Sequence, residues 1–196
     1  MRAGYPCRQE AYRLLEDGLK CNPGPWGTHS HTAALCAQRI AEAAGMDGEK
    51  AYVLGLLHDI GRKFGKGHLV HVYDGYRYMM ALGYPAAAKI CLTHSFHKPT
   101  LDVYIGKIDV PEEQLREMEN LLQSAVYDDY DRLIQLCDCM AGSEGIVNME
   151  ARMLDIKRRY GSYPREKWEA NLELRAYFEE KTGKDIYEIV KNEAVD

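Results

Sequence analysis

No stretch of this 196-residue sequence reaches the roughly 18 consecutive apolar residues that a helix needs to span a membrane. The first residues, Met-Arg-Ala-Gly-Tyr-Pro, also lack the apolar core of a secretion signal. No internal repeat, low-complexity tract or shift in composition divides the chain. We therefore expect a cytoplasmic protein with no membrane partner, folded as a single domain over residues 1–196.

Cysteine pairs of the C-x-x-C type are absent as well, although the sequence has six cysteines. A chain of this length can bury a hydrophobic core large enough to be stable without disulfides. Several of the cysteines stand beside apolar residues in predicted helices. This placement favours reduced thiols packed in the core over a zinc–thiolate site.

Basic residues are not in excess, because 25 Lys and Arg stand against 30 Asp and Glu, for a net charge of −5. This balance argues against a broad binding surface for a nucleic-acid polymer. It is compatible with a small phosphorylated substrate that a few local cations hold.

Apolar residues recur at spacings of three and four along most of the chain, which is the pattern of amphipathic helices. The pattern predicts an all-α fold, a compact helical bundle with a charged helical extension over residues 148–196. Only residues 98–110 leave a choice between a loop and a short strand. The charged helices of the extension would suit either a cover over a site or the contact of a homodimer.

Turn and capping residues divide this pattern into separate helices. Asp47 is an expected N-cap, and Gly61 is placed to end a helix in the left-handed conformation. The expected helices cover residues 7–20, the segment from Thr28 as N-cap to Ala44, residues 49–59, 68–82 and 86–96, a segment beginning at Pro111, and residues 127–141.

An unusual pair of ionisable residues ends the apolar run Tyr52-Val-Leu-Gly-Leu-Leu, where His58 and Asp59 follow one another. His58 continues the buried face of that helix, and burying an imidazole or a carboxylate is costly unless the group is paired or coordinated. Imidazole and carboxylate together are a ligand set for zinc, iron or manganese. The pair therefore indicates a metal site.

Other helices carry residues of the same types on their core-facing stripes. His29 stands at the start of one stripe, and His71 and His94 lie on two others. Asp138 interrupts the apolar run Leu-Ile-Gln-Leu-Cys-Asp-Cys-Met-Ala. Metal sites in helical bundles are built from inward-facing side chains of neighbouring helices, so these residues are candidate ligands. A buried hydrogen-bond cluster is the alternative explanation.

The order and types of these residues follow the pattern H…HD…D, which resembles the HD-domain superfamily of metal-dependent phosphohydrolases. Trp26-Gly-Thr-His-Ser is similar to the family's first-histidine motif, Leu56-Leu-His-Asp-Ile-Gly-Arg to its namesake motif, and Leu133-Ile-Gln-Leu-Cys-Asp to the helix of its final aspartate. The resemblance covers about residues 26–142. It implies that four residues hold a divalent cation, namely His29, His58, Asp59 and Asp138.

Two further histidines resemble the second metal site of some branches, His71 four residues before Gly75 and His94 in Leu-Thr-His-Ser-Phe-His. A role in helix capping or in supporting the ligands is the alternative for both. Ser95 stands where the cyclic-dinucleotide phosphodiesterase branch has a second histidine, which argues against a cyclic-dinucleotide substrate. The arrangement is closer to small members that cleave nucleotides or dinucleoside polyphosphates.

The resemblance implies hydrolysis of a small, nucleotide-like phosphate ester by a water that the metal activates. One or two ions of Fe, Mn, Zn, Mg, Co or Ni would suit these ligands. With two ions, Asp59 is the expected bridge, and His71 and His94 complete the second site. With one ion, His71 or His94 would be free to donate a proton or to bind phosphate, so Asp59, His71 and His94 are the candidate catalytic residues.

Two other functions fit the same residues. The rival prediction is a non-catalytic, metal-containing module that binds a nucleotide for signalling. A third is a purely structural helical protein, in which no stoichiometric ion would be found.

Residues around the His–Asp pair would serve the substrate. Arg62 and Lys63 follow the pair directly, and we expect them either to contact phosphate or to be ordinary solvated charges. Asp74 and Asp131 are candidates to position the water. The remaining histidines, expected in loops or on the surface, are His31, His68 and His97.

Overall fold

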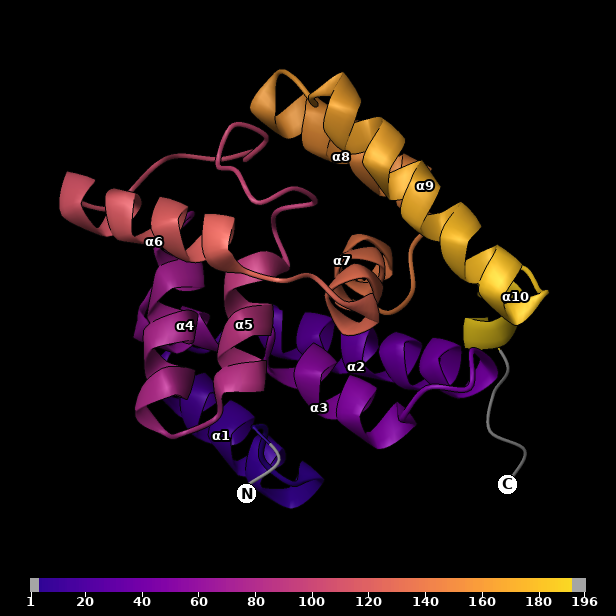
Figure 1. The fold of residues 1–196 in the computed structure, drawn as a ribbon, viewed down its shortest axis with the longest axis horizontal. Helices are drawn as coiled ribbons and strands as arrows, with labels where there is room; N and C mark the ends of the chain where they lie inside the picture. The colour runs from indigo at the N-terminus through magenta and orange to yellow at the C-terminus, as the bar shows by residue number, and fades with distance from the viewer. Residues whose placement is uncertain (1–3, 192–196) are drawn as a thin grey trace.

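Helices make up most of the structure, a computed structural model that describes residues 4–191 (Figure 1). Within that range there are ten α-helices, one 3-10 helix and no strand, which confirms the all-α prediction. None of these helices combines the length and the apolar composition that crossing a bilayer would require. Their bounds are α1 (Arg8–Cys21), α2 (Trp26–Ala43), α3 (Gly48–Leu57), η1 (Ile60–Phe64), α4 (Val70–Ala81), α5 (Pro85–Thr93), α6 (Glu112–Ser124), α7 (Asp129–Met140), α8 (Met149–Tyr160), α9 (Arg165–Thr182) and α10 (Ile186–Lys191).

Three helices form the centre of the bundle. α2 packs along α3, and α7 contacts both of them (Figure 1). α2 and α3 approach closely because Gly55 has no side chain, and a Cβ at this position would lie 2.9 Å from Cα of Ala34. Fully buried side chains such as Ile40, Leu54 and Ile134 fill the space between the three helices. Residues on the inner faces of α2, α3 and α7 are thereby brought close together.

A second group of helices lies beside this centre. α4 and α5 are side by side, and α6 crosses near them (Figure 1). Leu69, Leu92 and Met118 belong to a smaller core between these helices. Residues 98–110 contain no strand, so this segment is a loop, and its Tyr104 packs on Phe96 with ring centroids 5.8 Å apart.

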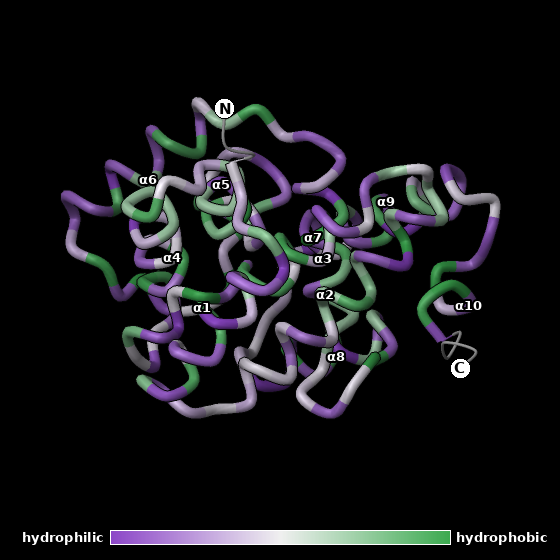
Figure 2. Tube along the Cα trace, turned by 90° about the horizontal axis from the view of Figure 1, so that it is seen from below, coloured by the Kyte–Doolittle hydropathy of each residue, from purple (hydrophilic) through white to green (hydrophobic). Residues whose placement is uncertain are grey.

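The helices of the extension contact the bundle. α8 and α9 contact α7, and α10 contacts α2 (Figure 1). Figure 2 shows hydrophobic and hydrophilic positions alternating along the outer helices, as expected for helices that bury one face. The extension therefore covers one side of the bundle, and the homodimer stays a prediction.

The predicted caps of the second and third helices have different outcomes. Asp47 caps α3 as predicted, because its Oδ1 accepts a hydrogen bond from the backbone N–H of Lys50 over 3.0 Å. Thr28 is not the N-cap of α2, so that prediction is wrong. The helix begins at Trp26, and the Thr28 hydroxyl donates to the carbonyl of Pro25 over 3.0 Å.

The prediction of a left-handed Gly61 is also wrong. α3 ends at Leu57, and the chain continues into η1 without a positive φ at this glycine. Gly61 is needed for close approach instead, because a Cβ there would lie 1.9 Å from the carbonyl oxygen of His71 and 2.5 Å from the amide nitrogen of Gly75. The glycine thus lets η1 lie directly against α4.

The cysteines are free thiols, and most of them belong to the core. Cys36, Cys91, Cys137 and Cys139 are buried, and burial raises the pKa of the Cys36 thiol to about 12. The prediction of core thiols is wrong for Cys7 and Cys21, which are exposed because they stand at the two ends of α1, outside its buried face.

Candidate metal centre

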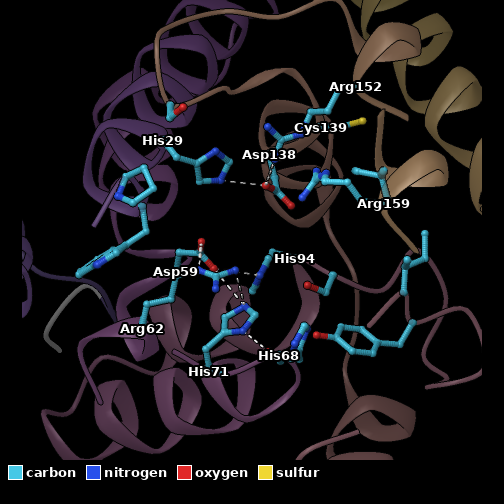
Figure 3. A pocket seen from close by; sticks show the side chains of 18 of the residues that line it. His29, Asp59, Arg62, His68, His71, His94, Asp138, Cys139, Arg152 and Arg159 are labelled. Carbon is cyan, nitrogen blue, oxygen red and sulfur yellow. Dashed lines mark hydrogen bonds and ion pairs between the residues drawn. The ribbon is translucent and has the colours of Figure 1, made fainter. Parts of the chain in front are cut away.

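The six predicted metal ligands lie close together, and five of them, all except His58, line one cavity of about 650 Å³ (Figure 3). Five of the side chains are buried, and Asp138 is partly exposed to the cavity. Each ligand comes from a core helix or from the residues that end one: His29 from α2, His58 and Asp59 from the end of α3, His71 from α4, His94 from the end of α5, and Asp138 from α7.

His29, His58 and Asp138 form a first triad, whose ligand atoms all lie within 4.8 Å of one another. Nε2 of His29 is 3.0 Å from Oδ1 of Asp138 and 3.2 Å from Nε2 of His58. The distance from Nε2 of His58 to Oδ1 of Asp138 is 3.8 Å. Three potential ligand atoms therefore surround one point between α2, α3 and α7.

Asp59, His71 and His94 form a second triad of the same size. Oδ1 of Asp59 lies 3.1 Å from Nε2 of His71 and 3.6 Å from Nε2 of His94. The other oxygen, Oδ2, is 3.9 Å from Nε2 of His58, a member of the first triad. Asp59 thus connects the two triads.

A backbone carbonyl orients each of the four imidazoles through its Nδ1 atom. Because a carbonyl oxygen can only accept, Nδ1 carries the proton, and Nε2 of the neutral ring presents a lone pair. The four lone pairs therefore face the interior of the triads. The pairs of ring and carbonyl are His29 with Ala141 at 3.0 Å, His58 with Gly55 at 2.7 Å, His71 with His68, and His94 with Cys91 at 2.9 Å.

This orientation leaves polar atoms without partners of the opposite kind. Nε2 of His29 and Nε2 of His58 face each other with no proton to share, and Oδ1 of Asp59 is buried without a hydrogen-bond donor. Acceptor atoms packed in this way are costly unless a cation lies among them. Neutral imidazole and ionised carboxylate are ligands that divalent transition metals accept, so the residues present fit such a cation.

The HD domain family model matches residues 26–141, more than half of the chain. The chain belongs to the HD-domain family. The match begins with α2 and ends just after α7, so it includes the six residues of both triads and excludes α8, α9 and α10. Comparison with curated proteins and with solved structures gave no significant match.

Electrostatic surroundings keep the ligands of this HD domain in the protonation states that metal binding requires. Burial lowers the pKa of His94 to about 3, so the ring is neutral near pH 7. Burial alone would raise the pKa of Asp59, but the positive charge of Arg62 holds it well below its usual range. The folded site thus offers a neutral His94 ring and an ionised Asp59 carboxylate.

Arg62 lies at the cavity wall, whereas Lys63 does not. Nε of Arg62 donates to Oδ2 of Asp59 over 2.5 Å, and the residue lines the cavity. The ammonium of Lys63 lies over the ring of Tyr78, 4.0 Å from its centroid, and the residue is not part of the cavity wall. The structure therefore brings only Arg62 of this pair to the site.

Neither of the acids considered for positioning a water lines the cavity. Asp131 is fully buried between α5 and α7, where it accepts from Lys89 over 2.6 Å and from Thr93 over 2.7 Å. It precedes Asp138 by seven residues on α7, which is about 10 Å along a helix. Asp74 lies in α4 and is also absent from the cavity wall.

Sequence reasoning missed the residues that α8 and α9 contribute to the cavity wall, among them Arg152, Arg159 and Lys167. Their helices have the charged composition of ordinary surface helices, so no local pattern marks them as part of a site. His97 lies in the loop after α5, as predicted, but its ring lines the cavity and Nε2 is 2.8 Å from Oδ1 of Asn171. Burial and the nearby charge of Lys167 lower the pKa of His97 to about 4.

Proposed function

We propose that this HD domain is a metal-dependent phosphohydrolase that cleaves a small, nucleotide-like phosphate ester with a metal-activated water. One observation supports the proposal above all others. Two triads of imidazole and carboxylate adjoin a single cavity, and they include two imidazole nitrogens that face each other and a buried carboxylate oxygen with no donor.

The two triads would hold two cations with Asp59 between them. Oδ1 of Asp59 faces the second triad, and Oδ2 is within 3.9 Å of His58 in the first. A divalent cation in such a site lowers the pKa of a bound water and polarises a phosphoryl oxygen. Ligand sets rich in imidazole suit Fe, Ni or Zn better than Mg.

Charge and size make the cavity suitable for a nucleotide-like anion. Among the described residues, the wall has two carboxylates, those of the triads, against five cationic side chains, while the whole chain has a net charge of −5. This local excess of positive charge would concentrate an anionic substrate at the site. The volume of about 650 Å³ falls in the range of roughly 300–1,000 Å³ that is typical of small-ligand sites. The five cations are Arg62, Lys66, Arg152, Arg159 and Lys167.

Aromatic side chains complete the wall. Tyr104, Tyr160 and Tyr163 line the cavity together with the cations. Flat rings of this kind offer a surface on which a nucleobase can stack, while the cations bind phosphate. This combination supports a nucleotide-like ester over a purely aliphatic one.

Arg62 has a positioning role in this proposal. Its guanidinium donates to Oδ2 of Asp59, so the other carboxylate oxygen is left to face His71 and His94. Because His71 and His94 present lone pairs at Nε2, their role is to hold the cation rather than to donate a proton. Lys63 has no part in the proposed site, because its side chain contacts Tyr78 outside the cavity.

The proposal is tested with protein reconstituted with Mn, Fe, Co, Ni, Zn or Mg and assayed against a panel of phosphomonoesters, phosphodiesters and nucleotides. We expect turnover with at least one metal and ester, and a loss of about 100-fold or more in His58→Ala because a metal ligand is removed. His31→Ala is the matched control, since His31 is on α2 but does not line the cavity. Circular dichroism should show the helical fold in both variants.

Two outcomes would overturn the proposal. One is a wild-type protein that cleaves no ester with any of the metals. The other is a His58→Ala variant as active as the wild type. A nucleotide that raises the melting temperature but is recovered intact would instead identify a non-catalytic binding module.

A further inference from the structure

α8 and α9 reach the cavity although they lie outside the segment that matches the family. Figure 3 shows Arg152 and Arg159, both from α8, on the same side of Asp138. Nη2 of Arg152 is 3.8 Å from Oδ1 of Asp138, and its guanidinium also donates to the carbonyl of Ala141. The extension thus places positive charge directly beside the first triad.

Lys167 of α9 is a cation of this wall that has no acidic partner in the part of the chain that the structure describes. Its ammonium donates to the carbonyl oxygen of Ser95 over 2.9 Å. A lysine ammonium has three N–H donors, so two of them have no protein acceptor here. The remaining basic residues of the same helix, Arg165, Arg175 and Lys181, all form ion pairs with carboxylates.

Lys167 is half-buried, and an ammonium partly removed from water without a counter-charge is unfavourable, because no anion offsets the lost hydration. Consistent with this, burial lowers the pKa of Lys167 even though the carboxylate of Asp138 acts in the opposite direction. The ammonium lines the cavity that adjoins both triads. An anion bound in the cavity would supply the charge that the protein does not.

The position of Lys167 is fixed from both sides of the cavity wall. Asn171, one turn further along α9, donates to the hydroxyl of Tyr163 over 2.8 Å, and this bond leaves its Oδ1 to accept from Nε2 of His97. His97 follows Ser95 by two residues, so α9 is bound to the loop after α5 at two neighbouring points. The ammonium is therefore held in place before a ligand arrives, which lowers the entropic cost of binding.

We infer that Lys167, together with Arg152 of the same cavity wall, binds the phosphate group of the substrate in its terminal, dianionic form. The inference rests on the proposed function in one respect, that the phosphate to be cleaved lies at the triads. A terminal phosphate carries more negative charge than an internal diester, so an ammonium and a guanidinium facing the triads favour a phosphomonoester. The family segment would then supply the triads of the substrate site, and the extension would supply the cations that bind its phosphate.

The test compares Lys167→Met, Lys167→Gln and Lys167→Arg in metal-loaded, full-length protein. Inorganic phosphate is the probe for calorimetric binding, and 4-nitrophenyl phosphate is the substrate for steady-state kinetics. In the Met and Gln variants we expect a phosphate Kd and a KM about 10- to 100-fold higher, with kcat changed much less. The Arg variant keeps the charge and should stay within a few-fold of the wild type.

Lys98→Met is the matched control. Lys98 also contacts α9, through an ion pair with Glu166, but it does not line the cavity. Its phosphate affinity and KM should equal those of the wild type. If Lys167→Met does not fold, Lys167→Gln makes the same comparison, because it retains a donor for the carbonyl of Ser95.

Unchanged phosphate affinity in Lys167→Gln, or wild-type protein that binds no phosphate, would overturn the inference. A lower melting temperature with unchanged affinity would show that Lys167 only anchors α9. A failure of the proposed function gives a different result. If phosphate binds through Lys167 but no ester is cleaved, hydrolysis is excluded while the anion site stands.

Discussion

Single side chains in this site take their orientation mainly from their own turn of backbone. Three of the four imidazoles donate through Nδ1 to the carbonyl three residues earlier, and only His29 uses a distant one. Such a contact fixes the rotation and the tautomer of a ring locally. The direction of the free nitrogen is therefore set by the local backbone, at the C-terminal ends of α3 and α5 for His58 and His94 and in the first turn of α4 for His71. The local pairs are His58 with Gly55, His71 with His68, and His94 with Cys91.

Asp59→Asn tests the residue that connects the triads. The amide keeps the shape of the side chain but removes the charge that a cation requires, so we expect metal affinity to fall at least about 10-fold and turnover about 100-fold or more. Asp74→Asn is the matched control on α4, away from the cavity, and should behave as the wild type. An Asp59→Asn variant with unchanged metal affinity would remove Asp59 from the ligand set. Isothermal titration with Mn measures the affinity.

Two buried rings predict how stability depends on pH. The pKa of His94 is about 3 and that of His97 about 4, because both rings are buried. In the unfolded chain each ring has an ordinary pKa near 6.5, so the unfolded state binds more protons below that pH. The free energy of unfolding is therefore unaffected by these rings above about pH 6.5. It decreases as the pH falls from 6.5 towards 4, by at most about 1.4 kcal/mol per pH unit for each ring.

Urea unfolding in the presence of chelator, at pH 7, 6 and 5, measures this dependence. We expect the free energy of unfolding to decrease at each step and the decrease to be smaller in His97→Gln, which has one titrating ring fewer. A free energy that is constant or rises between pH 7 and 5 would show that these rings are not held neutral by the fold.

Whole helices were easier to predict than their ends. Spacings of three and four identify the buried stripe of each helix, and because all six ligands lie on such stripes or directly after one, the structure brings them together. Helix ends depend on neighbours that are remote in sequence. Thr28 is a good N-cap by type, yet α2 begins two residues earlier. Lys63 follows Arg62 directly, but the direction in which each side chain points is decided by packing.

At the contact between η1 and α4, a single added methyl group should lower the free energy of unfolding markedly. In Gly61→Ala the new Cβ would overlap the backbone of His71 and Gly75, so η1 or α4 must move. We expect a loss of about 3 kcal/mol or more in the free energy of unfolding. Metal affinity should fall too, because His71 would shift relative to Asp59.

Gly83→Ala is the control for the loss of glycine itself. Gly83 has a φ of +79° and open space around the position of a Cβ, so only backbone strain of about 1–2 kcal/mol is expected. Urea denaturation of both variants gives the comparison. An equal loss in the free energy of unfolding in both variants would mean that η1 and α4 are not packed as closely as described.

Residues from two parts of the chain make up the candidate site. The family segment supplies both triads, and its motifs make these residues recognisable in the sequence. α8 and α9 supply Arg152, Arg159 and Lys167, which no motif marks, because a charged helix shows its inward face only after it has packed on α7. The grouping of the candidate metal ligands could therefore be predicted from the sequence, whereas the cationic wall of the cavity could not.

Anomalous diffraction from crystals of manganese-loaded protein would locate the cations themselves. We predict two peaks, one among His29, His58 and Asp138 and the other among Asp59, His71 and His94, and the loss of at least one of them in Asp59→Asn. A fully loaded crystal with no peak at either triad, or with manganese bound only elsewhere on the chain, would contradict the metal centre and the hydrolase proposal with it.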